Sequence, residues 1–254
     1  MIQRLSRGAA HAHTLRAART AADVAAVAAA EILALLESAI AWRGEAHLCL
    51  AGGGTPRLLH EALRASAFEG WPHVHIWFGD ERCVPPDHAD SNIGMAHETL
   101  LDLVPINPLH INRLAGELEP AEAARQYAIL LRAQAERLNR EHPLIDALVL
   151  GMGSDGHTAS VFPGSPLLAA DQDPARDWCA AVYVPKLDSW RLTLTPAVLQ
   201  AASAVAVLVS GAGKNEALRR VVRGDAPVTD LPIRLLETAR GDVAWFVDHA
   251  ALFG

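Results

Sequence analysis

The chain lacks a long uncharged apolar stretch. No apolar run reaches the roughly 18 uncharged residues that mark a membrane-spanning helix. The nearest approach, residues 21–40, is interrupted by Asp23, Glu31 and Glu37, so we expect an alanine-rich helix of a soluble protein there. The N-terminus also lacks the continuous apolar core and small-residue cleavage site of a signal peptide. Together these absences predict a cytoplasmic protein.

An excess of basic residues is also missing. The chain has 22 basic and 29 acidic residues and a net charge of −7, which disfavours a nucleic-acid partner but leaves room for a local basic pocket. Its three cysteines, Cys49, Cys83 and Cys179, form no Cys-x-x-Cys pair, so neither a disulfide framework nor a zinc ribbon is expected. The histidines lack metal-ligand spacing, and the absence of a Gly-x-Ser-x-Gly motif disfavours a serine hydrolase.

The composition that remains is that of a globular protein. Hydrophobic residues make up 51% and charged residues 20% of the 254 positions, enough apolar material for a large core and too much for a disordered chain. A chain of this length can form one large domain or two small ones. It contains no linker, repeat or low-complexity tract, and its polar segments 85–91 and 171–177 are typical of surface loops. We therefore expect one domain over residues 1–254.

Short apolar runs alternate with longer helical patterns along the chain. The expected strands are 46–51, 74–78, 145–150, 180–184, 205–209 and 243–247, and the expected helices are 14–42, 56–65, 92–103, 120–141, 196–202 and 214–223. Most of the strands lack polar alternation, which indicates that both faces are covered. This order predicts an α/β fold with a largely parallel sheet, in which ligands bind at the carboxyl ends of the strands.

Four loops at such strand ends carry unusual chemistry. In the first, residues 51–56, consecutive glycines allow close approach of a ligand, and free amides at the next helix attract an anion. Thr55 adds a hydroxyl donor. The spacing matches neither the dinucleotide fingerprint nor the P-loop, and a plain tight turn is the alternative.

Two other loops supply positive charge. In residues 79–82, Arg82 can bind a phosphate or a carboxylate, although an ion pair with Asp80 or Glu81 explains the same residues. In residues 210–214, Lys214 follows a glycine turn and begins a helix, where its charge opposes the helix dipole. That placement favours an anionic ligand over a merely solvated lysine.

Residues 151–160 form the most informative loop. Three glycines surround Asp155 and His157, which lie two positions apart and are therefore able to share one site. Histidine titrates near neutral pH, so His157 is a candidate for moving protons. The alternative is a helix cap by Asp155 and a histidine bonded to backbone.

Taken together, these loops resemble the 6-phosphogluconolactonase family. The segments that carry the resemblance are Gly52-Gly53-Gly54-Thr55-Pro56, Asp80-Glu81-Arg82-x-Val84-Pro85 with Ser91-Asn92, Leu150 to Gly164, Gly211-x-x-Lys214, and Trp245-Phe246-x-Asp248. They occur in the order of the family and extend from about residue 50 to 250. The resemblance implies a Rossmann-like open sheet with helices on both faces. It also implies hydrolysis of 6-phospho-D-glucono-1,5-lactone to 6-phosphogluconate, the second step of the oxidative pentose phosphate pathway.

The resemblance implies roles for individual residues. His157 is expected to be the general base that activates water, and Asp155 to orient it or stabilise its charged form. Gly53, Gly54, Thr55 and Lys214 are expected to hold the 6-phosphate, with Ser165 as a further candidate; Arg82 would bind the phosphate or stabilise the oxyanion. A lactone needs no covalent nucleophile, and we expect no metal or organic cofactor. The expected partner is a small sugar-phosphate lactone, without nucleic acid or membrane, bound by a monomer or small homo-oligomer.

Three rival interpretations remain. An amino-sugar-phosphate isomerase or deaminase is similar around Asp80 and His157, but it carries a glutamate where this chain has Phe162. A sugar-phosphate sensor domain of a transcriptional regulator would need a DNA-binding segment, and residues 1–14 are too short for one. A purely structural α/β protein would need four glycine-rich or charged strand ends to coincide by chance.

Overall fold

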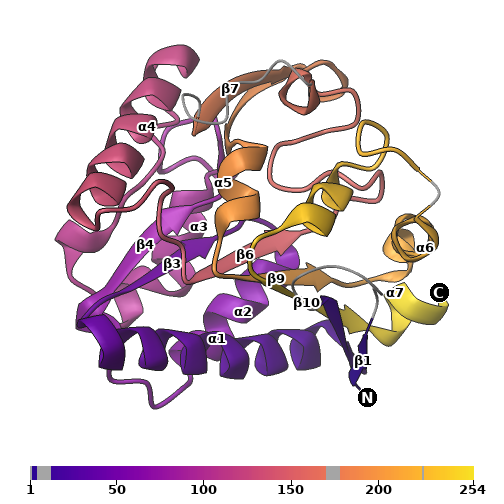
Figure 1. The fold of residues 1–254 in the computed structure, drawn as a ribbon, viewed down its shortest axis with the longest axis horizontal. Helices are drawn as coiled ribbons and strands as arrows, with labels where there is room; N and C mark the ends of the chain where they lie inside the picture. The colour runs from indigo at the N-terminus through magenta and orange to yellow at the C-terminus, as the bar shows by residue number, and fades with distance from the viewer. Residues whose placement is uncertain (1, 5–12, 170–177, 225) are drawn as a thin grey trace.

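A seven-stranded sheet runs through the centre of the computed structural model, which describes residues 2–4, 13–169, 178–224 and 226–254 (Figure 1). Its strand order is β1-β2-β10-β9-β6-β3-β4. The strands are β1 (Ile2–Arg4), β2 (His13–Ala18), β3 (Ala46–Leu50), β4 (Val74–Phe78), β6 (Ala147–Gly151), β9 (Ala204–Val209) and β10 (Asp242–Asp248). Only β1 is antiparallel to its neighbour, so the predicted largely parallel sheet is confirmed.

The direction of strand addition reverses between β3 and β6. From β3 the chain moves outward to β4, whereas from β6 it moves the other way through β9 to β10. Loops that follow strands on either side of such a reversal diverge and leave a crevice at the carboxyl edge of the sheet. The loops that follow β3 and β6 are residues 51–56 and 151–160, two of the segments chosen from the sequence.

Helices cover both faces of the sheet (Figure 1). Helices α1 (Ala21–Arg43) and α2 (Gly54–Arg64) lie on one face, and α4 (Pro120–Arg137) and α5 (Pro196–Ala201) lie on the other. The remaining helices are α3 (Asn92–Thr99), α6 (Asn215–Arg223) and α7 (His249–Phe253). On α4, the buried Tyr127 hydroxyl accepts a hydrogen bond of 2.8 Å from the backbone N–H of Phe78, which anchors this helix to the end of β4.

Helix α1 is the one described helix that is long and apolar enough to cross a membrane. Its N-terminus is closed by a capping box, in which Thr20 and Asp23 exchange side chain to backbone hydrogen bonds, and Gly44 ends it with a φ of 84°. Val24, Ile32 and Leu36 on its inner side are buried against the sheet and α2. The helix therefore contributes a face to the protein core.

The first expected helix begins too early. Residues 13–18 form β2, and the helix begins only at Ala21. Alanine and arginine in this stretch favour a helix locally, but pairing of β2 with β10 over six residues overrides that preference. The helix expected at 92–103 ends at Thr99, with a 3-10 turn after it, and the one expected at 120–141 ends at Arg137.

A second, antiparallel sheet was not predicted. It consists of β5 (Asp80–Arg82), β8 (Ser189–Leu194) and β7 (Cys179–Val184) in that order. The strand expected at 180–184 therefore forms, but it pairs here rather than in the parallel sheet. A short 3-10 turn, η5 (Pro185–Leu187), joins β7 to β8, and Asp188 after it adopts a φ of 46°. Residues 85–91 form a loop as expected, whereas 171–177 lie outside the described residues.

Candidate active site

A cavity of about 330 Å³ opens at the carboxyl ends of β3, β6 and β9. Six of the residues predicted for the site line it: Gly53, Gly54, Thr55, Arg82, His157 and Lys214. A larger cavity of about 440 Å³ lies beside α1 at the opposite, amino ends of β9 and β10. Size therefore does not identify the site; the convergence of polar and glycine-rich loops does.

The N-terminus of α2 forms one wall of the cavity. Gly53 adopts a φ of 107°, which turns the chain from β3 into the helix, and no side chain caps the first turn. The amides at the start of the helix therefore remain available to an anion. Lys214 lies on the same cavity, and its burial lowers the pKa of its ammonium from the ordinary value. A helix N-terminus and a half-buried lysine suit a phosphate.

Asp248, at the end of β10, holds the turn that positions Lys214. The backbone N–H of Gly211 donates to both of its carboxylate oxygens at 3.0 Å. One of these oxygens also accepts a 2.7 Å bond from the N–H of Ala251 and so caps α7. The late Trp245-Phe246-x-Asp248 segment thus supports the loop at residues 210–214, although Asp248 does not line the cavity.

Asp155 and His157 form the expected pair. His157 Nδ1 donates to Asp155 Oδ1 at 2.6 Å, and the His157 backbone N–H donates to the same oxygen at 3.2 Å. His157 Nε2 has no hydrogen-bond partner within the described part of the chain. Burial lowers the pKa of His157, and Asp155 partly offsets that effect. The imidazole is therefore held in one tautomer with a free basic nitrogen.

Gly153 explains why this loop needs glycine. A Cβ at this position would lie 2.1 Å from His157 Nδ1, so any side chain would displace the imidazole from its partner. The His157 ring also stacks on Phe162, with centroids 4.3 Å apart and an angle of 29° between planes. The ring is thus packed against both a bare backbone and an aromatic side chain.

Asp80 is oriented toward the same cavity by hydrogen bonds rather than by an ion pair. Ser160 Oγ donates to its Oδ2 at 2.7 Å, and Asn92 Nδ2 donates to its Oδ1 at 3.2 Å. Neither Ser160 nor Asn92 was singled out for the site from the sequence. Ser160 is 80 residues and Asn92 is 12 residues away from Asp80 in sequence, so only the folded structure brings them together.

Glu81 has a structural role. Its buried carboxylate accepts N–H bonds of 2.8 Å from Asn92 and Ile93, and one of 2.7 Å from Arg82, so it binds the start of α3. Burial raises the pKa of Glu81, and these backbone bonds oppose the rise.

Arg82 and Ser165 have different placements. The Arg82 guanidinium lines the cavity and donates from one nitrogen to the backbone carbonyl of Asp90, which fixes its direction. Ser165 does not line the cavity. Its hydroxyl instead accepts from the N–H of Leu167 at 3.3 Å and caps the 3-10 turn η4 (Pro166–Leu168).

The sequence did not single out Ser210, which lines the cavity. Its buried hydroxyl has no hydrogen-bond partner among the residues that the structure describes. The sequence did contain a signal for Ser210 as a site residue, because it directly follows β9 in a loop already chosen for its glycines. No group of three or more His, Cys, Asp or Glu able to hold a metal occurs within the described ranges.

The chain matches the family model of glucosamine-6-phosphate isomerases/6-phosphogluconolactonase over residues 19–245. It belongs to this family. Among curated proteins, a 6-phosphogluconolactonase of Nostoc sp. is 37% identical over 221 residues, which cover 87% of this chain and 89% of the relative. The human 6-phosphogluconolactonase is 36% identical and the match covers 80% and 78%. Within the family, the chain is thus similar to the lactonases along most of its length.

Solved structures agree with this family assignment. The 6-phosphogluconolactonase from Trypanosoma cruzi superimposes with a TM-score of 0.78 at 26% identity, covering 93% of this chain and 94% of that one. A monomeric glucosamine-6-phosphate deaminase superimposes with a TM-score of 0.77 at 19% identity, which shows a shared fold alone. These neighbours confirm the predicted Rossmann-like α/β fold.

Proposed function

We propose that this cavity hydrolyses 6-phospho-D-glucono-1,5-lactone to 6-phospho-D-gluconate by general-base activation of water. The reaction is the second step of the oxidative pentose phosphate pathway, and relatives that cover most of the chain are named for it. The observation that carries the mechanism is the Asp155–His157 pair, which presents a free imidazole nitrogen on the same cavity as the uncapped N-terminus of α2.

His157 Nε2 takes a proton from a water molecule as the water oxygen bonds to C1 of the lactone. The C1 carbonyl oxygen becomes an oxyanion, and its collapse breaks the bond between C1 and the ring oxygen. The proton on Nε2 then passes to that ring oxygen, which leaves as a hydroxyl. Asp155 holds Nδ1–H throughout, so the tautomer with a basic Nε2 persists.

The phosphate is held at the other wall. The first amides of α2, at Gly54 and Thr55, follow Gly53 and meet the anion together with the ammonium of Lys214. Arg82 supplies the second positive charge of the cavity, for the phosphate or for the oxyanion. Binding at this wall orients the lactone ring toward His157.

The deaminase alternative is disfavoured by Phe162. This ring occupies the position of the expected deaminase glutamate and stacks directly on His157. A carboxylate for ring opening is therefore missing from that position, and a lactone needs none. Turnover of glucosamine 6-phosphate would contradict this conclusion.

We propose further that residues 1–254 act as one domain, since the cavity is lined by segments from residue 51 to residue 214. We also propose a monomer or small homo-oligomer in the cytoplasm, a reducing compartment that the three free cysteines fit. Neither nucleic acid nor a membrane is needed as a partner for this reaction.

Hydrolysis of freshly prepared lactone, with spontaneous opening subtracted, tests the proposal. We expect the His157→Ala variant to lose about 10²- to 10⁴-fold in kcat, the usual contribution of a general base. The matched control is His97→Ala, because His97 forms an exposed 2.8 Å pair with Asp102 outside the cavity. A folded wild type without acceleration would refute the lactonase function, whereas full activity of His157→Ala would refute only the base assignment.

A further inference from the structure

The two carboxylate oxygens of Asp155 accept hydrogen bonds from two different side chains. Oδ1 accepts from His157, whereas Oδ2 accepts from the ammonium of Lys186. Lys186 belongs to the 3-10 turn η5 at the tip of the β7–β8 hairpin, in the small antiparallel sheet. It is 31 residues away from Asp155 in sequence and does not line the cavity. A side chain from a separate sheet thus reaches the back of the candidate catalytic pair.

The same lysine contacts the ring that packs on His157. The Lys186 nitrogen lies 4.7 Å from the centroid of the Phe162 ring, within cation–π distance. Phe162 in turn stacks on His157. Four side chains therefore contact one another in a ring: Lys186 contacts Asp155 and Phe162, and both of these contact His157. Removal of the lysine would leave two of those contacts without their outer partner.

We propose that Lys186 is a positioning residue that keeps His157 in its neutral, proton-accepting form by neutralising the charge of Asp155. The proposal rests on the proposed function in taking His157 as the base. Asp155 alone fixes the imidazole but also favours the imidazolium, which cannot accept a proton. An ammonium on the second carboxylate oxygen retains the orientation while reducing the negative potential at the ring.

The charges around His157 support separate roles for Asp155, which orients the ring, and Lys186, which offsets the negative charge of Asp155. Asp155 and Asp80 both act to raise the pKa of His157, and Lys186 acts to lower it. Lys214 and Arg82 line the same cavity as further positive charges. Lys186 is the cation bonded to the carboxylate that itself touches the ring.

The expected effect is modest because the Lys186 side chain is 51% exposed and solvent screens its charge. In Lys186→Gln we expect the acid limb of the kcat/KM profile to move to higher pH by about half a unit. The sign follows from charge, since loss of the cation stabilises imidazolium and less of the base form remains at a given pH. At high pH, where His157 is neutral in both proteins, activity should approach that of wild type.

Two variants separate this role from a structural one. Lys186→Arg keeps the positive charge and should restore the wild-type acid limb. Arg125→Gln is the matched control, because Arg125 forms an exposed ion pair with Glu122 on α4, and it should leave the profile unchanged. An equal loss of activity at every pH in Lys186→Gln would indicate a structural role and would overturn the proposal.

A titration of the substrate-free protein separates this inference from the lactonase function. We would follow the His157 ring by NMR and assign its signal by its loss in His157→Gln. The midpoint should rise in Lys186→Gln and return in Lys186→Arg, whether or not the protein turns over the lactone. An unchanged His157 midpoint in Lys186→Gln would refute the role of Lys186 and leave the proposed function intact.

Discussion

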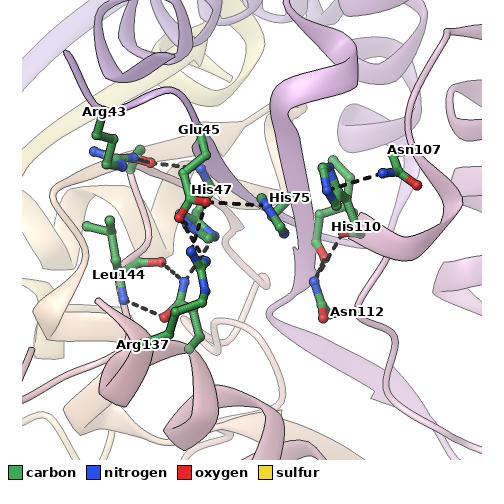
Figure 2. Close-up of polar contacts among 12 residues, drawn as sticks. Arg43, Glu45, His47, His75, Asn107, His110, Asn112, Arg137 and Leu144 are labelled. Carbon is green, nitrogen blue, oxygen red and sulfur yellow. Dashed lines mark hydrogen bonds and ion pairs between the residues drawn. The ribbon is translucent and has the colours of Figure 1, made fainter. Parts of the chain in front are cut away.

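Two histidine–carboxylate groups lie at opposite ends of the same parallel sheet. At the carboxyl ends, Asp155 binds His157 in a loop that lines a cavity. At the amino ends, Glu45 contacts His47 and His75 (Figure 2). His47 is the second residue of β3, which begins at Ala46, and His75 is the second residue of β4, which begins at Val74. Both groups combine imidazole with a carboxylate, so we look for the difference in their chemistry in the surroundings.

In the group at the amino ends, His47 has no unused ring nitrogen. His47 is fully buried, its Nδ1 accepts from Trp77 Nε1 at 3.1 Å, and its Nε2 lies 3.1 Å from Glu45 Oε1. His75 stacks on His47 with centroids 4.9 Å apart, and His110 stacks on His75 at 3.9 Å. Figure 2 shows His47, His75 and His110, with Arg137 beside Glu45.

The comparison teaches that a histidine beside a carboxylate is not in itself a catalytic site. His157 has one nitrogen fixed by Asp155 and one free at a cavity, which suits proton transfer. Both nitrogens of His47 are occupied by the fold, which suits a stable core. The contrast yields three tests, in which the variants should change stability at one end of the sheet and catalysis or binding at the other.

The largest effect is expected from His47→Leu. This change leaves the buried Trp77 N–H and the Gln134 amide without their shared acceptor, so the free energy of unfolding should fall by about 2–4 kcal/mol. Folded protein should keep its kcat, in contrast to His157→Ala. Urea unfolding followed by lactone hydrolysis checks both halves. A kcat as low as that of His157→Ala would break the distinction between the two groups.

Lys214→Met should weaken substrate binding. Loss of a charge-assisted contact to the phosphate costs about 1.5–3 kcal/mol, which corresponds to an increase in KM of roughly 10- to 100-fold. Lys214→Arg should recover much of the loss. The matched control is Arg137→Met at the opposite end of the sheet, where the guanidinium pairs with Glu45. If both methionine variants raised KM equally, anion binding would not be confined to the carboxyl ends.

The third test concerns a pH dependence of stability to which the histidines at the amino ends contribute. Burial lowers the pKa of both His47 and His75 to about 4, below the ordinary value of 6.5. Between these values the unfolded chain binds protons that the folded chain does not. The stability that these two histidines contribute is therefore fully present above pH 6.5 and is lost as the pH falls toward 4. Each such proton lowers the free energy of unfolding by about 1.4 kcal/mol per pH unit.

Urea titrations from pH 7 to 4.5 measure that slope. Glu45 adds to the slope only at the acid end of this range, because its pKa falls from the ordinary value of 4.5 to about 2 and only the unfolded chain protonates it there. A His75→Phe variant removes one of the buried histidines whose pKa is about 4, which include His47 and, on α2, His60, and should flatten the slope. A slope that is unchanged in His75→Phe would contradict the assignment of the pH dependence to this histidine stack.

Much of the candidate site was open to prediction because its chemistry is local. The pairing of Asp155 with His157 joins residues two apart, and the glycine turn at residues 52–54 joins a strand to the next helix directly. Strand ends also follow from apolar runs, and parallel strands place their carboxyl ends at one edge. The loops that hold the proposed base and the proposed phosphate site could therefore be chosen without a structure.

Contacts between distant segments could not be chosen in that way. Lys186 meets Asp155 across 31 residues, and Ser160 meets Asp80 across 80. The second sheet and strand β2 escaped prediction for the same reason, since their pairing partners are remote in sequence. Ser165 was chosen for its place just after the motif, and its hydroxyl caps a turn instead.

By itself, the amino-acid sequence determined the α/β class, five strands of the central sheet with the helices between them, and the local groups that face the sheet edge. Backbone periodicity and spacings of two to four residues act within one segment, and they need no fold to operate. Tertiary structure alone decided which carboxylate received a lysine, which histidine kept a free nitrogen and which was sealed in the core. Those outcomes depend on burial and on partners that only long-range packing brings together.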